Sequence, residues 1–291
     1  MGAQDLTLLL IGGVTKGCMY ALMAVGYQLV FVSTRVFNFS IGAVAILGGL
    51  VLLTLRSDVG LPFPVALVLV LIAGLALGWF YFQVLLRPVR HRDLATQMLV
   101  IFGMGLIIEN AYALIWGQQP LPAQPFLAKK MLLVMDMPIK VQSLWVIGLT
   151  VLSVLLLKLL LDRTWTGRAL RANAMNETAA RLVGVSLTSV GVTVYGITLA
   201  LAMLAGAAIS PITYAGGYIA VPLLLKGFAG LIVGGAGSPF AAALGGIILG
   251  LVEAGATAFI NPSYVDAIGM AFLLLFLLVR PQGLFAARTG Q

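Results

Sequence analysis

The residue types that usually carry enzymatic chemistry are scarce in this chain of 291 residues. His91 is the single histidine and lies in a basic stretch, so a histidine metal cluster or a Ser-His-Asp site has no support. Cys18 is the single cysteine, and the Gly-rich run 234–239 lacks the lysine that a phosphate-binding loop places before its Ser or Thr. We therefore expect no catalytic residue, no metal site and no cofactor in this chain.

Charged side chains within long apolar segments are the remaining candidates for chemistry. They are Lys16, Glu109, Lys226 and Glu253. If these segments cross a bilayer, an ionisable group near its centre costs ~3 kcal/mol or more and should face protein or water. For Lys16, near a helix end, we favour a side chain that reaches to the interface. Two interpretations stay open for Glu109–Asn110 and Lys226: they satisfy one another, or Lys226 or Glu109 lines a pathway.

Composition decides what kind of elements position these groups. The chain is 61% hydrophobic and 9% charged, whereas roughly a quarter of the residues of a soluble domain are charged. Its apolar residues fall in blocks near the ~20 residues that a helix needs to cross a bilayer. The shorter alternating segments of a membrane barrel are absent from the sequence. We predict an all-α, polytopic membrane protein that forms a single domain over residues 1–291.

The apolar blocks predict eight crossings and a ninth, less regular segment, Tyr218–Gly237, which contains Lys226 and several glycines. Whether this ninth segment crosses or re-enters stays open. The predicted crossings lie at about Leu6–Val32, Ile41–Leu55, Pro64–Leu86, Thr96–Trp116, Leu144–Leu161, Val190–Ile209, Ala241–Ile260 and Val265–Val279.

Basic residues in the connecting segments predict the orientation. If the ninth segment crosses, three basic groups lie on one side, and the positive-inside rule makes that side cytoplasmic. The N-terminus is then outside and the C-terminus inside. The segment 117–142 argues against this orientation with Lys129, Lys130 and Lys140, but it is outnumbered. The three groups are Arg87, Arg90 and Arg92; Arg163, Arg168, Arg171 and Arg181; and Arg280 and Arg288.

Glycine is frequent, with 34 residues, many inside the predicted crossings. Glycines four residues apart share a helix face and let a neighbouring helix approach closely. We interpret them as packing positions within a compact bundle rather than as a dimer motif. Four pairs have this spacing: Gly13/Gly17, Gly74/Gly78, Gly230/Gly234 and Gly246/Gly250.

The polar stretch 162–189 is the longest between strong apolar segments. An idle connector is one interpretation. Its Ala, Leu, Arg and Glu content favours a helix, however, and Gly184 is a plausible stop. A short, basic helix of this kind is suited to dock in a groove of a cytoplasmic partner.

Six segments, in the same order along nearly the whole chain, resemble the H-type permease subunit (LivH family) of branched-chain amino acid ABC importers. Each segment alone is a weak signal, because it consists mostly of glycine and apolar residues, but the ordered set is specific. The segments are GCMYALMAVGYQLVF at 17–31, NFSIG at 38–42, RPVR at 87–90, GRALRANAMN at 167–176, LIVGGAGSPFAAALGGIILGLVEA at 231–254 and LLVRPQGLF at 277–285.

The resemblance implies a non-catalytic permease subunit in a bacterial plasma membrane, importing branched-chain or other hydrophobic amino acids. It implies a second, related permease, two cytoplasmic ATPases and an extracytoplasmic solute-binding protein as partners, with the pathway between the permeases. The implied ATPase-coupling residues are Gly167, Arg168, Ala169, Arg171, Ala172 and Gly184. We take Asn38, Ser40, Glu109, Asn110 and Lys226 as candidate pathway residues.

One segment departs from the family. Where relatives read close to NFAHGE, this chain has Ser40, Ile41 and Ala43, so the titratable groups are missing. Urea, short amides and aromatic acids therefore remain alternative solutes. An alternative of another class is a secondary transporter or channel that works alone. The long basic segment, the lack of repeated carboxylates and the lack of a second homologous half argue against it.

Overall fold

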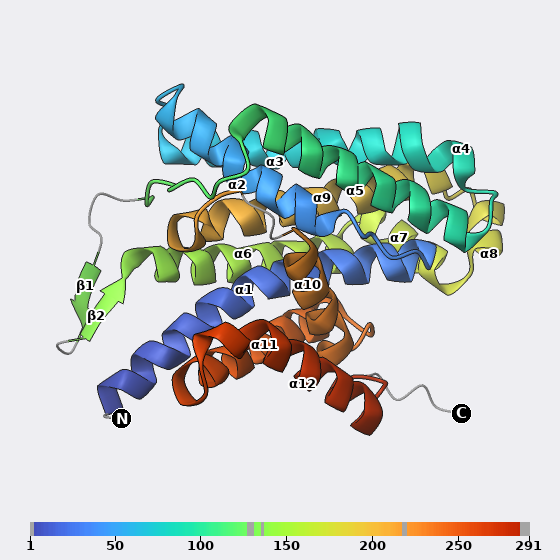
Figure 1. The fold of residues 1–291 in the computed structure, drawn as a ribbon. Helices are drawn as coiled ribbons and strands as arrows, with labels where there is room; N and C mark the ends of the chain where they lie inside the picture. Colours follow the sequence, from blue (N-terminus) through green and yellow to red (C-terminus); the bar gives the residue numbers. More distant parts are fainter. Residues whose placement is uncertain (1–2, 127–130, 135–136, 217–219, 286–291) are drawn as a thin grey trace.

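The computed structural model of the protein describes residues 3–126, 131–134, 137–216 and 220–285, and these form a bundle of helices with one small hairpin (Figure 1). The helices α3 and α11 have a proline in their first turn. Five helices begin at a residue whose side chain accepts a hydrogen bond from the first turn: α5 at Asp93, α7 at Thr164, α8 at Asn176, α9 at Ser186 and α11 at Ser238. The elements are α1 (Ala3–Thr34), α2 (Ile41–Ser57), α3 (Phe63–Phe80), the π-helical η1 (Tyr81–Leu86), α4 (Arg87–Val89), α5 (Leu94–Trp116), β1 (Met131–Val134), β2 (Met137–Lys140), α6 (Val141–Arg163), α7 (Trp165–Met175), α8 (Glu177–Leu182), α9 (Leu187–Thr213), α10 (Ala220–Gly234), α11 (Pro239–Phe259), the 3-10 turn η2 (Pro262–Tyr264) and α12 (Val265–Val279).

Within the described residues, seven helical stretches are long and apolar enough to cross a membrane. They correspond to seven of the eight predicted crossings, so the prediction of a polytopic helical membrane protein is confirmed. The remaining predicted crossing, α2, has 17 residues and α10 has 15, so both are shorter than the shortest of these stretches, Pro262–Val279 with 18 residues. The hairpin in which β1 pairs antiparallel with β2 was not predicted.

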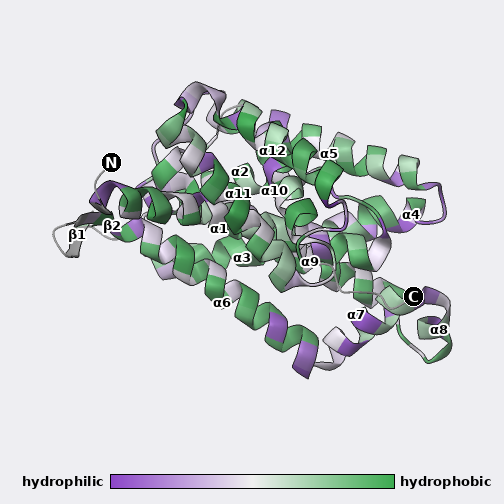
Figure 2. Ribbon diagram, turned by 90° about the horizontal axis from the view of Figure 1, so that it is seen from below, coloured by the Kyte–Doolittle hydropathy of each residue, from purple (hydrophilic) through white to green (hydrophobic). Residues whose placement is uncertain are grey.

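The bundle has two distinct ends. The start of α1 and the β1–β2 hairpin lie at one, here called the hairpin end (Figure 1). The short helices α4, α7 and α8 and the end of α12 lie at the other, here called the basic end. Hydrophilic residues concentrate near these ends, while the long helices between them are mostly hydrophobic (Figure 2).

The described members of the three basic groups gather at the basic end. Arg90 and Arg92 adjoin α4, Arg168 and Arg171 lie on α7, and Arg280 follows α12. Of the residues used to predict orientation, Lys129, Lys130 and Arg288 lie outside the described residues. The shared location satisfies the premise of the positive-inside argument, namely that these groups lie on one side.

Glycine-mediated contacts hold the centre of the bundle. A Cβ on Gly17 of α1 would lie 2.7 Å from the Cα of Ile247 on α11, and one on Gly230 of α10 would lie 2.9 Å from the Cα of Gly246. On α3, a Cβ on Gly74 would lie 2.5 Å from the Cα of Ala200 on α9. The GxxxG pairs thus pack helices within this chain, as predicted.

The two short helices, α2 and α10, begin beside each other inside the bundle. Ser40, just before α2, is fully buried, and a Cβ on Gly42 would lie 3.0 Å from the Cβ of Leu224 on α10. From there α2 runs toward the hairpin end, where Arg56 donates to the carbonyls of Gln124 and Pro125 at 2.9 Å. The helix α10 runs toward the basic end, where the Val233 carbonyl accepts from the Leu284 N–H.

Within the predicted ninth segment, Tyr218–Gly237, the helix α10 covers Ala220–Gly234, and Tyr218 lies outside the described residues. Just before it, Ala215 forms a bridge with Leu121, in the segment that follows α5. Broken helices of this kind are stable at membrane depth only where protein or water covers the free backbone groups. Here the bundle interior provides that cover.

Candidate functional site

A cavity of about 360 Å³ lies toward the hairpin end, between α1, α2, α9, α10, α11 and α12. We call it the Lys226 cavity. Its position follows from the chain direction: α9 starts after α8 at the basic end, so its last turn, which lines the cavity with Thr213, lies at the opposite end. The turn between α11 and α12 closes the same region with Pro262 and Val265.

Four charged side chains from four helices line this cavity: Lys16 of α1, Lys226 of α10, Glu253 of α11 and Asp266 of α12. Lys226 Nζ lies 3.0 Å from Glu253 Oε1 and 2.6 Å from Asp266 Oδ1. The Lys226 side chain is 12% exposed and that of Glu253 is 1% exposed, whereas Asp266 is 69% exposed. The cluster therefore has a buried part, Lys226–Glu253, and an exposed acid, Asp266, that pairs with the same lysine.

Glu253 is anchored from the side of α1. The Tyr20 hydroxyl donates to Glu253 Oε2 at 2.8 Å, and Lys226 Nζ lies 5.6 Å from the centroid of the Tyr20 ring. The other carboxylate oxygen, Oε1, has the ion pair with Lys226 but no hydrogen-bond donor in suitable geometry. A buried carboxylate held in this way is stable because its charge is compensated locally.

Lys16 is the unpaired member of the set. It is half-buried, and among the described residues it takes part in no ion pair or hydrogen bond. Lys16 and Tyr20 are four residues apart on α1, so they share the helix face that borders the cavity. Lys16 therefore lines the cavity, and its reach to the membrane interface stays a prediction.

The other polar groups of the cavity are satisfied by their own helices. Ser210 donates to the Ala207 carbonyl at 3.1 Å, and Thr257 donates to the Glu253 carbonyl at 2.8 Å. The remaining wall is largely apolar, with Met19, Ile46, Ile209, Leu223 and Val265. The cavity therefore offers a charged region next to an apolar one.

Of the predicted pathway residues, only Lys226 lines this cavity. Asn38 and Ser40 are fully buried and form the turn that starts α2: Asn38 Oδ1 accepts from the Ser40 N–H at 3.0 Å and from its hydroxyl at 2.6 Å. Glu109 is half-buried beside a small hollow next to Ala220, and Asn110 donates to the Leu106 carbonyl at 2.8 Å. The idea that Glu109–Asn110 satisfies Lys226 was wrong, because Lys226 pairs with Glu253 and Asp266.

The predicted coupling segment folds as two short helices at the basic end, α7 and α8. The Thr164 hydroxyl accepts from the Gly167 N–H at 3.1 Å to cap α7, and Asn176 Oδ1 accepts from the Ala179 N–H at 3.0 Å to cap α8. Gly184 follows with a φ of +85° and ends α8, as predicted. Gly167 is buried, with no room for a Cβ next to the backbone of Leu161.

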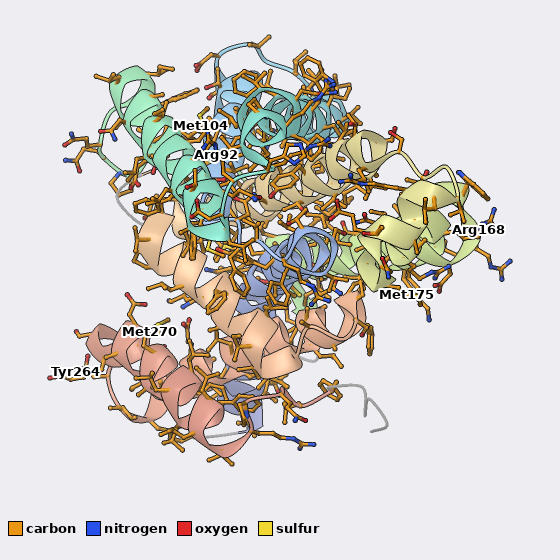
Figure 3. The ribbon with its side chains drawn as sticks, turned by 90° about the vertical axis from the view of Figure 1, so that its right-hand side faces the viewer. Arg92, Met104, Arg168, Met175, Tyr264 and Met270 are labelled. Carbon is orange, nitrogen blue, oxygen red and sulfur yellow. The ribbon has the colours of Figure 1, made fainter. Side chains whose placement is uncertain are left out.

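The outer face of these helices, here called the α7–α8 surface, is both basic and apolar. Trp165 is 74% exposed and Met175 85% exposed, and Leu182 and Val183 are also exposed. Arg168 stacks over the Trp165 ring at 5.3 Å and, seen from the basic end, points away from the bundle (Figure 3). Arg171 pairs with Asp162 at 2.9 Å, while the small residues Ala169 and Ala172 face partly inward.

A second cavity, of about 380 Å³, lies behind this surface and is called the basic-end cavity. Its charged lining consists of Arg35, Arg90 and Arg181 with one acid, Glu177, which pairs with Arg181 at 2.6 Å. His91 also lines it and accepts from Arg90 Nε at 3.0 Å.

One helix joins the two ends. Asn173 of α7 donates to the Ser33 carbonyl near the end of α1 at 3.0 Å. The same helix α1 carries Lys16, Met19 and Tyr20 into the Lys226 cavity. The helix α1 therefore contacts both α7 and the Lys226 cavity.

Sequence reasoning noticed Glu253 only as an isolated charge and did not single out Tyr20 or Asp266. Asp266 stands in the first turn of the last apolar helix, an ordinary place for an acid. A possible signal was the number of charges in the apolar segments, because a buried lysine requires a buried or nearby acid.

The comparisons with known proteins agree with this architecture. The family profile described as the branched-chain amino acid transport system / permease component matches residues 9–278. The high-affinity branched-chain amino acid transport system permease protein LivH of Escherichia coli (strain K12) is 30% identical, with 94% of each chain covered. The corresponding protein BraD of Pseudomonas aeruginosa is 28% identical, with 94% of each chain covered.

A solved structure, PsaBC from Streptococcus pneumoniae in complex with Fab, has a similar fold. Its TM-score is 0.51 at 13% identity, and the match covers 96% of this chain and 93% of the other. At this identity the similarity concerns the fold alone. On the extent of the family match, this chain belongs to the permease components of branched-chain amino acid transport systems.

Proposed function

We propose that this chain is the membrane-spanning permease subunit of an ATP-driven importer of branched-chain amino acids and forms half of the translocation pathway. The observation that carries the proposal is the course of α1, which borders the Lys226 cavity through Lys16 and Tyr20 and contacts α7 through Ser33. A candidate solute cavity and a candidate docking surface are thus connected by one continuous helix.

The α7–α8 surface supports docking of a cytoplasmic ATPase. Exposed Trp165, Met175 and Leu182 beside Arg168 combine the residue types that are enriched at protein interfaces. A basic charge surplus around them steers an acidic groove toward this end. The exposed apolar part adds to the basic face that the sequence had indicated.

The orientation follows from the same end. Because the described arginines of the connecting segments gather at the basic end, we assign that end to the cytoplasm of a bacterial plasma membrane. The hairpin end then faces outward, where an extracytoplasmic binding protein delivers solute into the Lys226 cavity. The N-terminus is outside and the C-terminus inside.

A second, homologous permease completes the pathway. Asp266 is 69% exposed although it borders the cavity, so this side of the site is open to a neighbour or to solvent. Two ATPases bind ATP and favour one arrangement of the paired permeases, and this difference in affinity shifts the population between outward-open and inward-open states.

The docking role is tested by charge reversal on α7. The double variant Arg168→Glu and Arg171→Glu should insert normally in the membrane but lose copurification with the ATPase subunits. A matched control reverses two exposed arginines at the same end outside the α7–α8 surface, Arg92→Glu with Arg280→Glu, and should keep the ATPases. Retention of the ATPases by both double variants would refute the docking role.

The dependence on a motor is tested by reconstitution. Vesicles that contain the complete transporter should accumulate a branched-chain amino acid against its gradient when ATP is supplied. If the purified chain alone accumulates the amino acid against its gradient, the proposal of a motor-driven permease fails and a solitary transporter is favoured.

A further inference from the structure

The Lys226 cavity holds equal numbers of opposite charges, and they are not all paired. Lys16 and Lys226 supply two positive charges, and Glu253 and Asp266 supply two negative charges. Because these four charges sum to zero, the cavity does not attract a solute with a net positive or net negative charge. Separate positive and negative groups on different helices instead suit a solute that carries both signs.

The four charged residues of the cavity differ in how accessible they are to a solute. Glu253 and Lys226 are buried and hold each other, with Tyr20 fixing the carboxylate. Lys16 of α1 has no ion pair within the described part of the chain, and Asp266 is largely exposed although one of its carboxylate oxygens lies 2.6 Å from Lys226 Nζ. Lys16 and Asp266 are therefore the groups that can exchange water for a solute without leaving a buried charge alone.

We propose that the Lys226 cavity is a binding site for a zwitterionic amino acid with an apolar side chain, in which Lys16 receives the carboxylate and Asp266 the ammonium group. The buried pair Lys226–Glu253 holds the site in shape and keeps its total charge at zero. The apolar wall of Met19, Ile46, Ile209, Leu223 and Val265 accepts the side chain. This inference rests on the proposed importer function and names the recognition chemistry within it.

The site chemistry also separates the solutes left open by the sequence. Urea and short amides carry no charge, so they cannot replace the water lost from Lys16 and Asp266 with ionic contacts. An aromatic acid that lacks an ammonium group pairs with Lys16 but offers the exposed Asp266 carboxylate no cation besides Lys226. A zwitterion satisfies both groups at once. The cavity volume of about 360 Å³ lies within the range of small-ligand sites.

The experiment uses the complete transporter in vesicles, with the loaded binding protein and ATP, and measures leucine accumulated per ATP hydrolysed. Lys16→Met and Asp266→Asn should each lower this ratio roughly tenfold or more, the loss expected for one charge-assisted hydrogen bond. ATP hydrolysis stimulated by the loaded binding protein should persist. Lys16→Arg, which keeps the cation, should restore most of the ratio.

Lys158→Met is the matched control, because Lys158 is an exposed lysine of α6 outside both cavities. It should leave the ratio unchanged. An unchanged ratio in Lys16→Met would overturn the site, and a loss in Lys16→Met with none in Asp266→Asn would replace it with a carboxylate site. Asp266→Asn alters a side chain that is 69% exposed, so it tests the site even if Lys16→Met fails to assemble.

Failure of the broader proposal has a different signature. If the parental complex does not accumulate leucine although it assembles and hydrolyses ATP, the importer function itself is wrong. If the parental complex transports and both cavity variants match it, the function stands and the zwitterion site is refuted.

Discussion

The two ends of the bundle each hold a cavity of similar volume, about 360 and 380 Å³, but they treat charge in opposite ways. In the Lys226 cavity, two lysines face two acids, and the buried lysine is paired twice. In the basic-end cavity, three arginines face a single acid, Glu177. Balanced charge at the hairpin end suits the proposed small zwitterionic solute. A surplus of positive charge at the basic end suits the proposed docking of an acidic protein surface.

Basic residues at the two ends also differ in whether they need an acidic partner. Lys226 lies within the apolar bundle and depends on Glu253 and Asp266 for its charge. Arg168 lies in the open, stacked on Trp165, and needs no acid. Burial decides between the two cases, because a desolvated charge must be compensated and a hydrated one need not be.

The largest effect is expected where both ends depend on the same contact. Gly250 of α11 packs directly on the backbone of Gly13 and Gly17 of α1, so Gly250→Val should force α1 and α11 apart and remove both the cavity and the docking surface. We expect near-complete loss of folded protein, measured by fluorescence-detected size exclusion. Gly255→Val, on the same helix with no atom near the added Cβ, should fold as the parent does. Equal behaviour of the two variants would contradict the packing role.

A smaller effect, confined to the hairpin end, is expected from breaking the buried ion pair. Lys226→Met leaves Glu253, which is 1% exposed, without its cation and should cost about 3–5 kcal/mol of stability. The measurement is thermal unfolding of the purified protein in detergent. The double variant Lys226→Met and Glu253→Gln should recover part of the loss. No recovery would mean that the two charges are not energetically coupled.

A still smaller effect, confined to the basic end, is expected from trimming the α7–α8 surface. Trp165→Ala should weaken ATPase binding by about 2 kcal/mol, a roughly thirtyfold rise in Kd. Titration with the purified ATPase measures the change. The thermal stability of the protein, which depends on the ion pair in the Lys226 cavity, should not change. Phe259→Ala, an equally exposed aromatic residue at the end of α11, is the control and should leave the affinity unchanged. Equal weakening by both variants would remove the distinction between the ends.

The smallest effect is expected at a helix cap that belongs to neither cavity. Asp93 accepts from the Thr96 hydroxyl and N–H, and these hydrogen bonds lower the pKa of its carboxyl. A lowered pKa means that the carboxylate stabilises α5 above its ordinary pKa, and that this stability is lost as the pH falls through the lowered value. Asp93→Asn should keep the cap but flatten this acidic pH dependence in thermal unfolding. An unchanged profile would show that the cap does not titrate.

Much of the fold could be predicted because it is encoded locally. The apolar blocks predicted the long helices, the GxxxG pairs were predicted to be packing positions, and Gly184 was predicted to stop the helix that precedes it, which is α8. Each of these signals depends on residues within a few turns of one helix. The physical reason is that helix formation and close helix approach both depend on side chains of one short stretch.

The site was harder to predict because it depends on contacts between helices. Lys226 meets Glu253 and Asp266 only because α10, α11 and α12 come together, and no spacing rule connects these positions. The same holds for Tyr20, which reaches Glu253 across 233 positions of sequence. The interior start of α2 was missed for another reason, because its apolar residues continue the pattern of a full crossing.

The glycine contacts between α1 and α11 restrict how this permease can move. Helices whose backbones already touch, as at Gly17 and Ile247, cannot come closer, and parting them would open a void that no side chain is long enough to fill. Small sliding movements and rotations of one helix against the other keep the two backbones in contact at little energetic cost. Under the proposed function, we expect α1 and α11 to move by shear, and this motion would connect a displacement at Ser33 to the residues that line the Lys226 cavity.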